Sequence, residues 1–397
     1  MRFRHPPIPG SLGGLIRAAM THHRVSRMLR LGCLLAAGLI AVAITGCRKQ
    51  IAPPRPYLAF VVNKESNSVA VVDLASARIV ATIPVASLPE KAMRRPRSNQ
   101  IYVVSVSGTV SIIEFPSLAV VRTIKIGQSA RGLVFSPDGK HAYTLNPESG
   151  EIVFLDCNAM KETARVSVVP GMSALAITPD GKTLIASDPA GNLLYFVSTQ
   201  ARRVLGFVTV GKSPGPLAVS LDGSVVFVAN TGDEKISAVE VSSRTLLAHI
   251  ETGTRPSGLV LKPDGGELFV LSDEGSTMTI VDASEDNIEQ VLPTGKDPAA
   301  AVFTADSRLM YLASAGDGFV MAFNVANRSV QSTLHVGVRP QSLALTPDER
   351  FLAVADSASG NLAIVRTSPL SLVTVIPVGS DPVDVIVPGW EKGQSGS

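Results

Sequence analysis

A short turn motif recurs along this chain with a period of 42 residues. The segment Ser-Pro-Asp-Gly ends at Gly139, and related segments follow it, with their aspartates at Asp138, Asp180, Asp222, Asp264, Asp306 and Asp348. A second series with the same period consists of Gly127, Gly211, Gly253, Gly295, Gly337 and Gly379, interrupted only by Val169. The last five of these glycines are each followed three residues later by proline. Agreement between independent positions indicates a repeat architecture.

Each repeat has the pattern of four short strands. Residues 216–253 contain an apolar run at 217–219, the turn Asp222-Gly223, and three further strand-like segments at 225–229, 236–241 and 244–251. Four strands joined by turns within one such repeat are typical of a β-propeller blade. Glycine suits the tight turn because it tolerates positive φ, and proline suits a connection that needs no backbone N–H donor.

The number of repeats predicts the number of blades. Second strands are predicted to begin near residues 58, 101, 141, 183, 225, 267, 309 and 351, which gives eight blades. Seven blades are the alternative, because the unit around 94–107 is degenerate. The chain starts with a second strand and ends with a lone first strand at 383–387, and their pairing would close the ring without an open edge. We therefore predict an all-β propeller over residues 57–390 and a disordered tail at 391–397.

The first 46 residues have the pattern of a secretory signal. Arg24, Arg27 and Arg30 precede an apolar run at 31–44, which is shorter than the roughly 20 residues of a membrane-spanning helix. Cys47 directly follows the small residue Gly46, and this pattern resembles the bacterial lipobox. The resemblance implies cleavage before Cys47 and lipidation of its side chain. An uncleaved anchor helix is the alternative.

These features predict the location of the protein. We expect a lipoprotein signal peptide at 1–46, a lipidated tether at 47–56, and attachment to a membrane through the lipid on Cys47. Arg48 occupies the position where an aspartate would favour inner-membrane retention. We therefore expect an extracytoplasmic protein on the outer membrane or cell surface rather than the inner membrane.

Removal of the predicted signal changes the charge and the set of cysteines. The whole chain has a net charge of +3, but residues 1–46 hold six basic residues and no acidic ones, so the remainder carries −3. This balance gives no electrostatic case for nucleic-acid binding. Cys33 leaves with the signal and Cys47 carries lipid, so Cys157 remains alone and no internal disulfide can form. We expect an inert thiol there.

Several segments resemble a known repeat family. They include Phe60-Val61-Val62-Asn63, the run S-V-A-V-V-D at 68–73, Val226–Asn230 and the recurrent V-G-x-x-P segments. These resemble the Tyr-Val-Thr-Asn (YVTN) repeat over nearly all of the chain beyond residue 56. The resemblance implies an extracytoplasmic β-propeller of the broader WD40-like class, usually with seven blades. Related propellers include lactonases, surface-layer components and haem d1 proteins, so it implies no single function.

No catalytic residue, metal site or cofactor is predicted. Beyond the signal, the histidines are His141, His249 and His335, which lie in different parts of their repeats and should not converge. No cluster of His, Cys or carboxylates has metal-site spacing, and no nucleophile elbow is present. A basic stretch, composed of Lys91, Arg94, Arg95 and Arg97, either contacts an anionic group or belongs to a degenerate hairpin.

The loops at one face of the predicted ring gather charge. Loops that follow the outer strands lead to the channel mouth, and we predict a binding rim there, formed by Arg131, Lys212, Arg255, Lys296, Asp297, Arg339 and Asp381. Loops between second and third strands are expected to add outer acidic groups, namely Glu148, Asp188, Asp233, Glu234, Asp273, Glu274, Asp317 and Asp356. Propellers usually bind ligands or partners on such loops, although a solvated rim of internal ion pairs is the alternative.

Three functions are consistent with these observations. The first is a non-enzymatic binding or scaffold propeller on the bacterial envelope, with a protein or a small molecule as its partner. The second is an extracytoplasmic hydrolase, such as a lactonase, that acts at the channel mouth. The third is a propeller that handles haem or another cofactor, which the lack of a histidine at the channel mouth disfavours.

Overall fold

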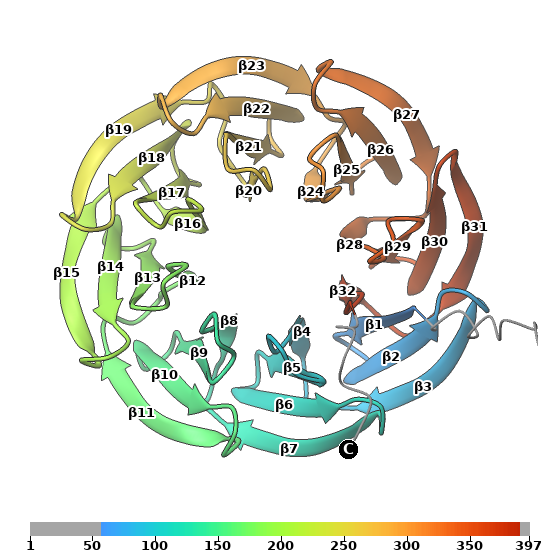
Figure 1. Cartoon of the computed structure of the whole chain (residues 1–397), viewed down its shortest axis with the longest axis horizontal. Helices are drawn as coiled ribbons and strands as arrows, with labels where there is room; N and C mark the ends of the chain where they lie inside the picture. Colours follow the sequence, from blue (N-terminus) through green and yellow to red (C-terminus); the bar gives the residue numbers. More distant parts are fainter. Residues whose placement is uncertain (1–56, 390–397) are drawn as a thin grey trace, which may run out of the picture. The chain divides into compact units, whose positions relative to one another are not determined.

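The computed structural model describes residues 57–389, which form a ring of eight four-stranded antiparallel sheets (Figure 1). We number these blades 1 to 8. The innermost strands are, in blade order, β32 (Pro382–Ile386), β4 (Pro89–Arg94), β8 (Arg131–Phe135), β12 (Ala174–Ile177), β16 (Pro214–Val219), β20 (Gly258–Leu261), β24 (Pro298–Phe303) and β28 (Pro340–Leu345). The second strands are β1 (Leu58–Asn63), β5 (Gln100–Ser105), β9 (His141–Asn146), β13 (Thr183–Asp188), β17 (Val225–Asn230), β21 (Glu267–Ser272), β25 (Leu309–Ser314) and β29 (Phe351–Asp356).

The two remaining positions of each blade complete the sheets. The third strands are β2 (Ser68–Asp73), β6 (Thr109–Glu114), β10 (Glu151–Asp156), β14 (Leu193–Ser198), β18 (Lys235–Glu240), β22 (Thr277–Asp282), β26 (Phe319–Asn324) and β30 (Asn361–Thr367). The outer strands are β3 (Arg78–Pro84), β7 (Ala119–Lys125), β11 (Lys161–Ser167), β15 (Arg203–Thr209), β19 (Thr245–Glu251), β23 (Asn287–Pro293), β27 (Ser329–His335) and β31 (Leu370–Pro377). The described part of the chain contains no helix that could cross a membrane.

The prediction of eight blades is confirmed, and the alternative of seven is wrong. The degenerate unit forms a complete sheet of β4, β5, β6 and β7. Its irregular turn contains Arg97 at φ 54°, so an arginine adopts the left-handed conformation that later repeats assign mainly to glycine. The backbone geometry of the turn is therefore kept although its sequence signature is lost.

The C-terminal strand closes the ring as predicted. Strand β32 pairs antiparallel with β1, with Val61 opposite Val385, so the first blade contains both ends of the described chain (Figure 1). Asp384 of β32 also accepts hydrogen bonds from the Ser342 hydroxyl (3.0 Å) in blade 8 and the Ala92 N–H (2.9 Å) in blade 2. The closing strand is thus fixed to both neighbouring blades, and neither side of the seam is left as a free edge.

The recurrent aspartates form the turns between first and second strands. Asp138 accepts hydrogen bonds from the Ser136 hydroxyl (2.7 Å) and the Lys140 N–H (3.0 Å), and Gly139 has a φ of 69°. A glycine meets this positive φ without steric cost. The motif therefore recurs because each residue type satisfies one requirement of the turn: a hydroxyl donor, a carboxylate acceptor and a left-handed residue.

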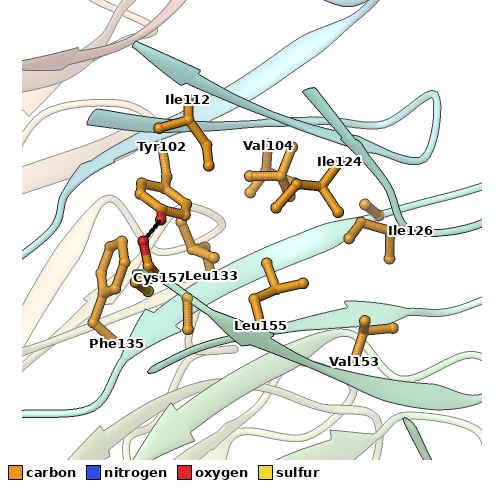
Figure 2. Packing of buried hydrophobic residues seen from close by; sticks show 13 residues of the cluster. Tyr102, Val104, Ile112, Ile124, Ile126, Leu133, Phe135, Val153, Leu155 and Cys157 are labelled. Carbon is orange, nitrogen blue, oxygen red and sulfur yellow. Dashed lines mark hydrogen bonds between the residues drawn. The ribbon is translucent and has the colours of Figure 1, made fainter. Parts of the chain in front are cut away.

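The hydrophobic core is divided into eight clusters, one at each interface between adjacent blades. Alternation along the strands places successive apolar side chains on opposite faces of each blade, so every blade packs against both neighbours. Figure 2 shows the cluster between blades 2 and 3, where Tyr102 and Phe135 pack edge to face at 5.1 Å. This continuous packing holds the loops at the two faces of the ring on a rigid scaffold.

Candidate functional site

Two sets of loops share one face of the ring, and together we call them the rim. The inner rim loops connect outer strands to the following inner strands, at residues 85–88, 126–130, 168–173, 210–213, 252–257, 294–297, 336–339 and 378–381. The outer rim loops connect second to third strands, at residues 64–67, 106–108, 147–150, 189–192, 231–234, 273–276, 315–318 and 357–360. All the predicted site residues except Arg131 lie in inner rim loops; Arg131 is the first residue of β8.

Lys212 and Lys296 occupy equivalent positions in the loops leading to blades 5 and 7. The backbone N–H of Lys212 donates to the Asp233 carboxylate (3.2 Å), and that of Lys296 donates to the Asp317 carboxylate (2.7 Å). Both lysine side chains are exposed, and within residues 57–389 neither ammonium group has a hydrogen-bond or ion-pair partner. The carboxylates therefore fix the backbone of these lysines and leave their charges available.

Arg255 lies between these two lysines, in the loop leading to blade 6. Its guanidinium Nε forms an ion pair with Glu274 at 2.5 Å, and this contact lowers the pKa of the Glu274 carboxyl. Arg255 and Glu274 line an open groove of about 720 Å³ together with Asp273, Asp297 and the uncharged residues Thr231, Pro256 and Ser257. The groove thus contains one cation, Arg255, and three carboxylates. The charge of Arg255 is neutralised by one of them, Glu274.

Arg339 and Asp297 lie in neighbouring inner rim loops, at blades 8 and 7. Their charged groups are 3.9 Å apart, and both side chains are largely exposed. Such a pair contributes little to stability. Arg255 and Arg339 therefore form internal ion pairs, as the alternative interpretation of the rim predicts. Lys212 and Lys296 form none with the described residues.

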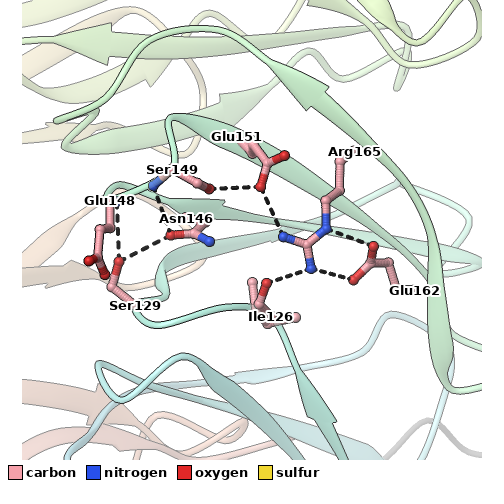
Figure 3. Close-up of polar contacts among 8 residues, drawn as sticks. All are labelled: Ile126, Ser129, Asn146, Glu148, Ser149, Glu151, Glu162 and Arg165. Carbon is pink, nitrogen blue, oxygen red and sulfur yellow. Dashed lines mark hydrogen bonds and ion pairs between the residues drawn. The ribbon is translucent and has the colours of Figure 1, made fainter.

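Arg131 and Asp381 lie away from this groove. Arg131 is exposed at blade 3, where the preceding loop is fixed by the Ser129 hydroxyl bound to Asn146 Oδ1 at 3.2 Å (Figure 3). Asp381 precedes β32 at blade 1, and its backbone carbonyl accepts the Lys64 N–H (2.8 Å). The structure therefore does not bring all seven predicted residues together; the charged rim is concentrated over blades 5 to 8.

Two of the predicted outer acidic groups are not on the surface. Asp188 and Asp356 are 2% and 0% exposed, because each is the last residue of a second strand and lies beneath the loops. Asp188 accepts hydrogen bonds from the N–H groups of Ala190 and Gly191 at 3.1 and 3.0 Å. The prediction that these two residues form part of the charged rim is wrong.

The basic stretch is mainly structural. Arg95 donates to the backbone carbonyls of Gly139 (2.6 Å) and Cys157 (3.0 Å) and to the Gln100 side chain (3.0 Å), which ties blade 2 to blade 3. Arg94 donates to the Ser98 carbonyl at 3.0 Å. The interpretation as a degenerate hairpin is therefore confirmed for these two arginines.

Cys157 is fully buried in the cluster of Figure 2, and burial raises the pKa of its thiol to about 11. Such an environment disfavours the reactive thiolate, in agreement with the expectation of an inert thiol. Within residues 57–389, no group of three His, Cys, Asp or Glu side chains could hold a metal ion. Cys47 lies outside the described residues.

Comparisons with known proteins agree with this architecture. Residues 97–290 match the family described as lactonase, 7-bladed beta-propeller, and residues 263–388 match the cytochrome D1 heme domain. The chain is thus similar to these two families over two overlapping parts of its length. Its eight blades differ from the seven in the description of the first family. A search of curated proteins gave no match.

Solved structures share this propeller fold at low sequence identity. The dihydro-heme d1 dehydrogenase NirN in complex with DHE aligns with a TM-score of 0.73 and 16% identity, over 84% of this chain and 76% of that one. Apo AztD from Citrobacter koseri aligns with a TM-score of 0.67 and 13% identity, over 83% and 97%. Hydrazine synthase from Kuenenia stuttgartiensis aligns with a TM-score of 0.54 and 20% identity, over 65% and 89%.

The histidines of this propeller do not lie on the innermost strands that line the channel. His141 lies on the second strand β9, whereas His249 and His335 lie on the outer strands β19 and β27. Haem iron is commonly held by an axial histidine. The described residues therefore do not fit a haem held in the channel by one of these histidines.

Proposed function

We propose that this protein is a non-enzymatic binding propeller of the bacterial envelope, whose rim over blades 5 to 8 binds an anionic group of a protein or small-molecule partner. The observation that carries this proposal is that Lys212 and Lys296, at equivalent positions of two blades, have the same surroundings. In each, a carboxylate holds the backbone N–H while the ammonium group stays exposed and unpaired among the described residues. Cations on preordered loops favour fast association with anionic groups because their backbone needs no reorganisation.

The surrounding carboxylates restrict which partners fit. Asp233, Asp273, Glu274 and Asp317 lie in the outer rim loops of blades 5 to 7, outside the lysines. A uniformly anionic partner would be repelled there, since like charges in an interface oppose binding. The rim therefore favours a partner with an anionic group that reaches the mouth of the channel and neutral or basic groups around it.

The predicted lipid on Cys47 would place this rim at a membrane surface. We propose an extracytoplasmic lipoprotein, on the outer membrane or cell surface, in which residues 47–56 tether the propeller. A tethered binding module acts at a high effective concentration toward partners in the same envelope layer. No nucleic-acid role is proposed, because the chain beyond residue 46 has a net charge of −3.

The experiment compares what co-purifies with the chain from the envelope of its native host. The test variant is Lys212→Glu with Lys296→Glu, and the matched control is Lys140→Glu with Lys182→Glu on the turns between first and second strands. Quantitative mass spectrometry of bound proteins and small molecules should show a component reduced at least about tenfold by the rim variant, as for loss of a major contact, and unaffected by the control. Equal recovery from both variants would contradict the proposal.

A lactonase-like hydrolase is the second candidate. It is favoured by the family match over residues 97–290 and by the groove that places Arg255 beside Asp273 and Asp297. Hydrolysis of a panel of lactones by the purified chain, abolished by Asp273→Asn with the fold intact, would replace the binding proposal with this one. Cofactor handling is the third candidate, supported by the match of residues 263–388, and a visible absorption band in the protein isolated from its host would favour it.

A further inference from the structure

A ring of buried polar residues lies directly beneath the rim. It consists of the last residue of every second strand, namely Asn63, Ser105, Asn146, Asp188, Asn230, Ser272, Ser314 and Asp356, and each is at most 3% exposed. We call this set the subrim ring. Buried polar side chains need hydrogen-bond partners, because an unpaired one loses its hydration without compensation.

Two of the three asparagines of the subrim ring, Asn63 and Asn230, act as donors. The Asn63 amide donates to the Val378 carbonyl (2.9 Å), which belongs to the residue before Gly379 in the inner rim loop of blade 1. The Asn230 amide donates to the Ser237 hydroxyl at 2.9 Å. The amide group thus links the end of the second strand to the rim or to the third strand.

Asp356 occupies the same position in blade 8 but has no such donor when it is ionised. It is 0% exposed, and neither carboxyl oxygen has a hydrogen-bond partner among the described residues. The carboxyl group is pressed against the rim loop, since a Cβ at Gly337 would meet its Oδ2 at 2.4 Å. Asp188, the other acid of the ring, differs because two N–H groups bind its carboxylate.

We propose that Asp356 is held as a neutral carboxylic acid that replaces the asparagine amide, and that its ionisation opens the inner rim loop at residues 336–339. By equivalence with Asn63 and Val378, the acceptor of its proton is the carbonyl of Val336. Loss of the proton leaves a buried charge facing a carbonyl dipole, and the loop moves to admit water. Because this loop carries Arg339, the proton on Asp356 controls the geometry of one side of the rim.

The surroundings of Asp356 support a proton rather than a counter-ion as the neutralising group. Charged residues on the elements packed around it are Arg339 of the loop above, Arg366 at the far end of β30, and Asp381 and Asp384 of the closing segment. Burial raises the pKa of the Asp356 carboxyl to about 7. The transition therefore falls near neutral pH, within the range that an envelope protein meets.

Hydrogen exchange of the rim loop tests this proposal, whatever the rim binds. In the whole chain, the opening equilibrium is reported by the N–H groups of Ser357 and Ala358, which donate to the carbonyls of Arg339 (3.0 Å) and Val338 (3.3 Å) in this loop. It should rise by about tenfold per pH unit between pH 5 and pH 7, after correction for intrinsic exchange, and then level off. Asp356→Asn should reduce this rise to less than about threefold over the whole interval, because an amide donor remains at every pH.

Two further variants keep the result interpretable. Asp188→Asn is the matched control at the same position of blade 4, and it should leave the pH dependence at Ser357 and Ala358 unchanged. Asp356→Ser, which copies Ser272 and Ser314, should also remove the pH dependence, and it serves as the test if the asparagine variant fails to fold. Persistence of the wild-type pH dependence in either folded Asp356 variant would overturn the proposal, as would its absence in the wild type.

Discussion

Gly337 lies against the carboxyl group of Asp356, so that a Cβ at Gly337 would meet Oδ2 at 2.4 Å and Cγ at 2.6 Å. The same relationship joins Gly127 to Asn146, Gly211 to Asn230 and, across the ring closure, Gly379 to Asn63. The periodic glycines therefore make room for the polar side chains of the subrim ring. This explains why glycine recurs at a position where a positive φ is not required in every repeat.

Substitution of Gly337 should therefore destabilise the propeller. Gly337→Ala is expected to lower the free energy of unfolding by about 1–3 kcal/mol, as overpacking of a closed site does. Gly266→Ala is the control, since a Cβ there would meet only Asp264 Oδ1 at 3.5 Å, an ordinary contact distance. Urea denaturation measures both variants. Equal stability of the two would show that the close contact does not constrain position 337.

The stability of the propeller should be highest at mildly acidic pH. Hydrogen bonds from the Ser220 and Thr304 hydroxyls and from turn N–H groups lower the pKa of Asp222 and Asp306 to about 2, so their contribution is present above about pH 4 and lost below it. Burial raises the pKa of Asp356 to about 7, so its contribution is present at low pH and lost as pH rises from about 4 to 7.

These opposite dependences predict a maximum of the melting temperature near pH 4–5. Asp356→Asn should flatten the decline on the neutral side and leave the acid side unchanged. Thermal denaturation of the wild type and the variant across pH 2–8 measures this. A wild-type maximum at pH 7 or above would show that Asp356 does not dominate the neutral side.

The blades and their order could be predicted from the sequence because they depend on local periodicity. Turn motifs such as Asp222-Gly223 and the alternation of the strands lie within one repeat, and the second strand predicted near residue 225 begins there. Closure through residues 383–387 followed from counting strands, and β32 occupies residues 382–386. The degenerate blade was harder to predict because Arg97 adopts the turn conformation without the glycine signature.

The burial of Asp188 and Asp356 could not be predicted from the acidic residues alone. Whether an acid at the end of a second strand reaches solvent depends on a rim loop that folds over it. A usable signal was the separation of 19 residues between a periodic glycine and a polar residue, as in Gly211 with Asn230 and Gly337 with Asp356. In blade 4 the residue 19 positions before Asp188 is Val169 rather than glycine. There the Asp188 carboxylate accepts a hydrogen bond from the Ala190 N–H in the outer rim loop that follows it.

The link between blades 2 and 3 through Arg95 should contribute measurably to stability. Arg95→Ala removes hydrogen bonds to Gly139, Gln100 and Cys157. The Cys157 carbonyl keeps the bond from the Tyr102 hydroxyl, but the Gly139 carbonyl loses its side-chain donor, so the substitution should cost about 2–3 kcal/mol. Arg97→Ala, at an exposed neighbouring residue, is the control. Urea unfolding curves report the difference. A loss of less than about 0.5 kcal/mol, typical of surface substitutions, would show that Arg95 does not join the blades.

The proposed anchor predicts a change of compartment. Cys47→Ser should block lipidation, so the protein should appear in the soluble extracytoplasmic fraction or accumulate as an unprocessed precursor. Fractionation of cells with labelling by a palmitate analogue measures both outcomes, and Cys33→Ser provides the control within the predicted signal. Unchanged membrane retention and unchanged labelling of the Cys47 variant would contradict the anchor.

Binding at the rim is tested most directly by photo-cross-linking in the native host. A photoreactive amino acid would replace Thr231 or Val338, exposed rim residues whose substitution leaves Lys212 and Lys296 in place. The controls carry it at Lys140, Lys182 or Arg308 on the turns between first and second strands. The account predicts a discrete adduct from the rim positions over blades 5 to 8 and none from the control turns. Adducts from the control turns alone, or equal adducts from both sets of positions, would contradict it.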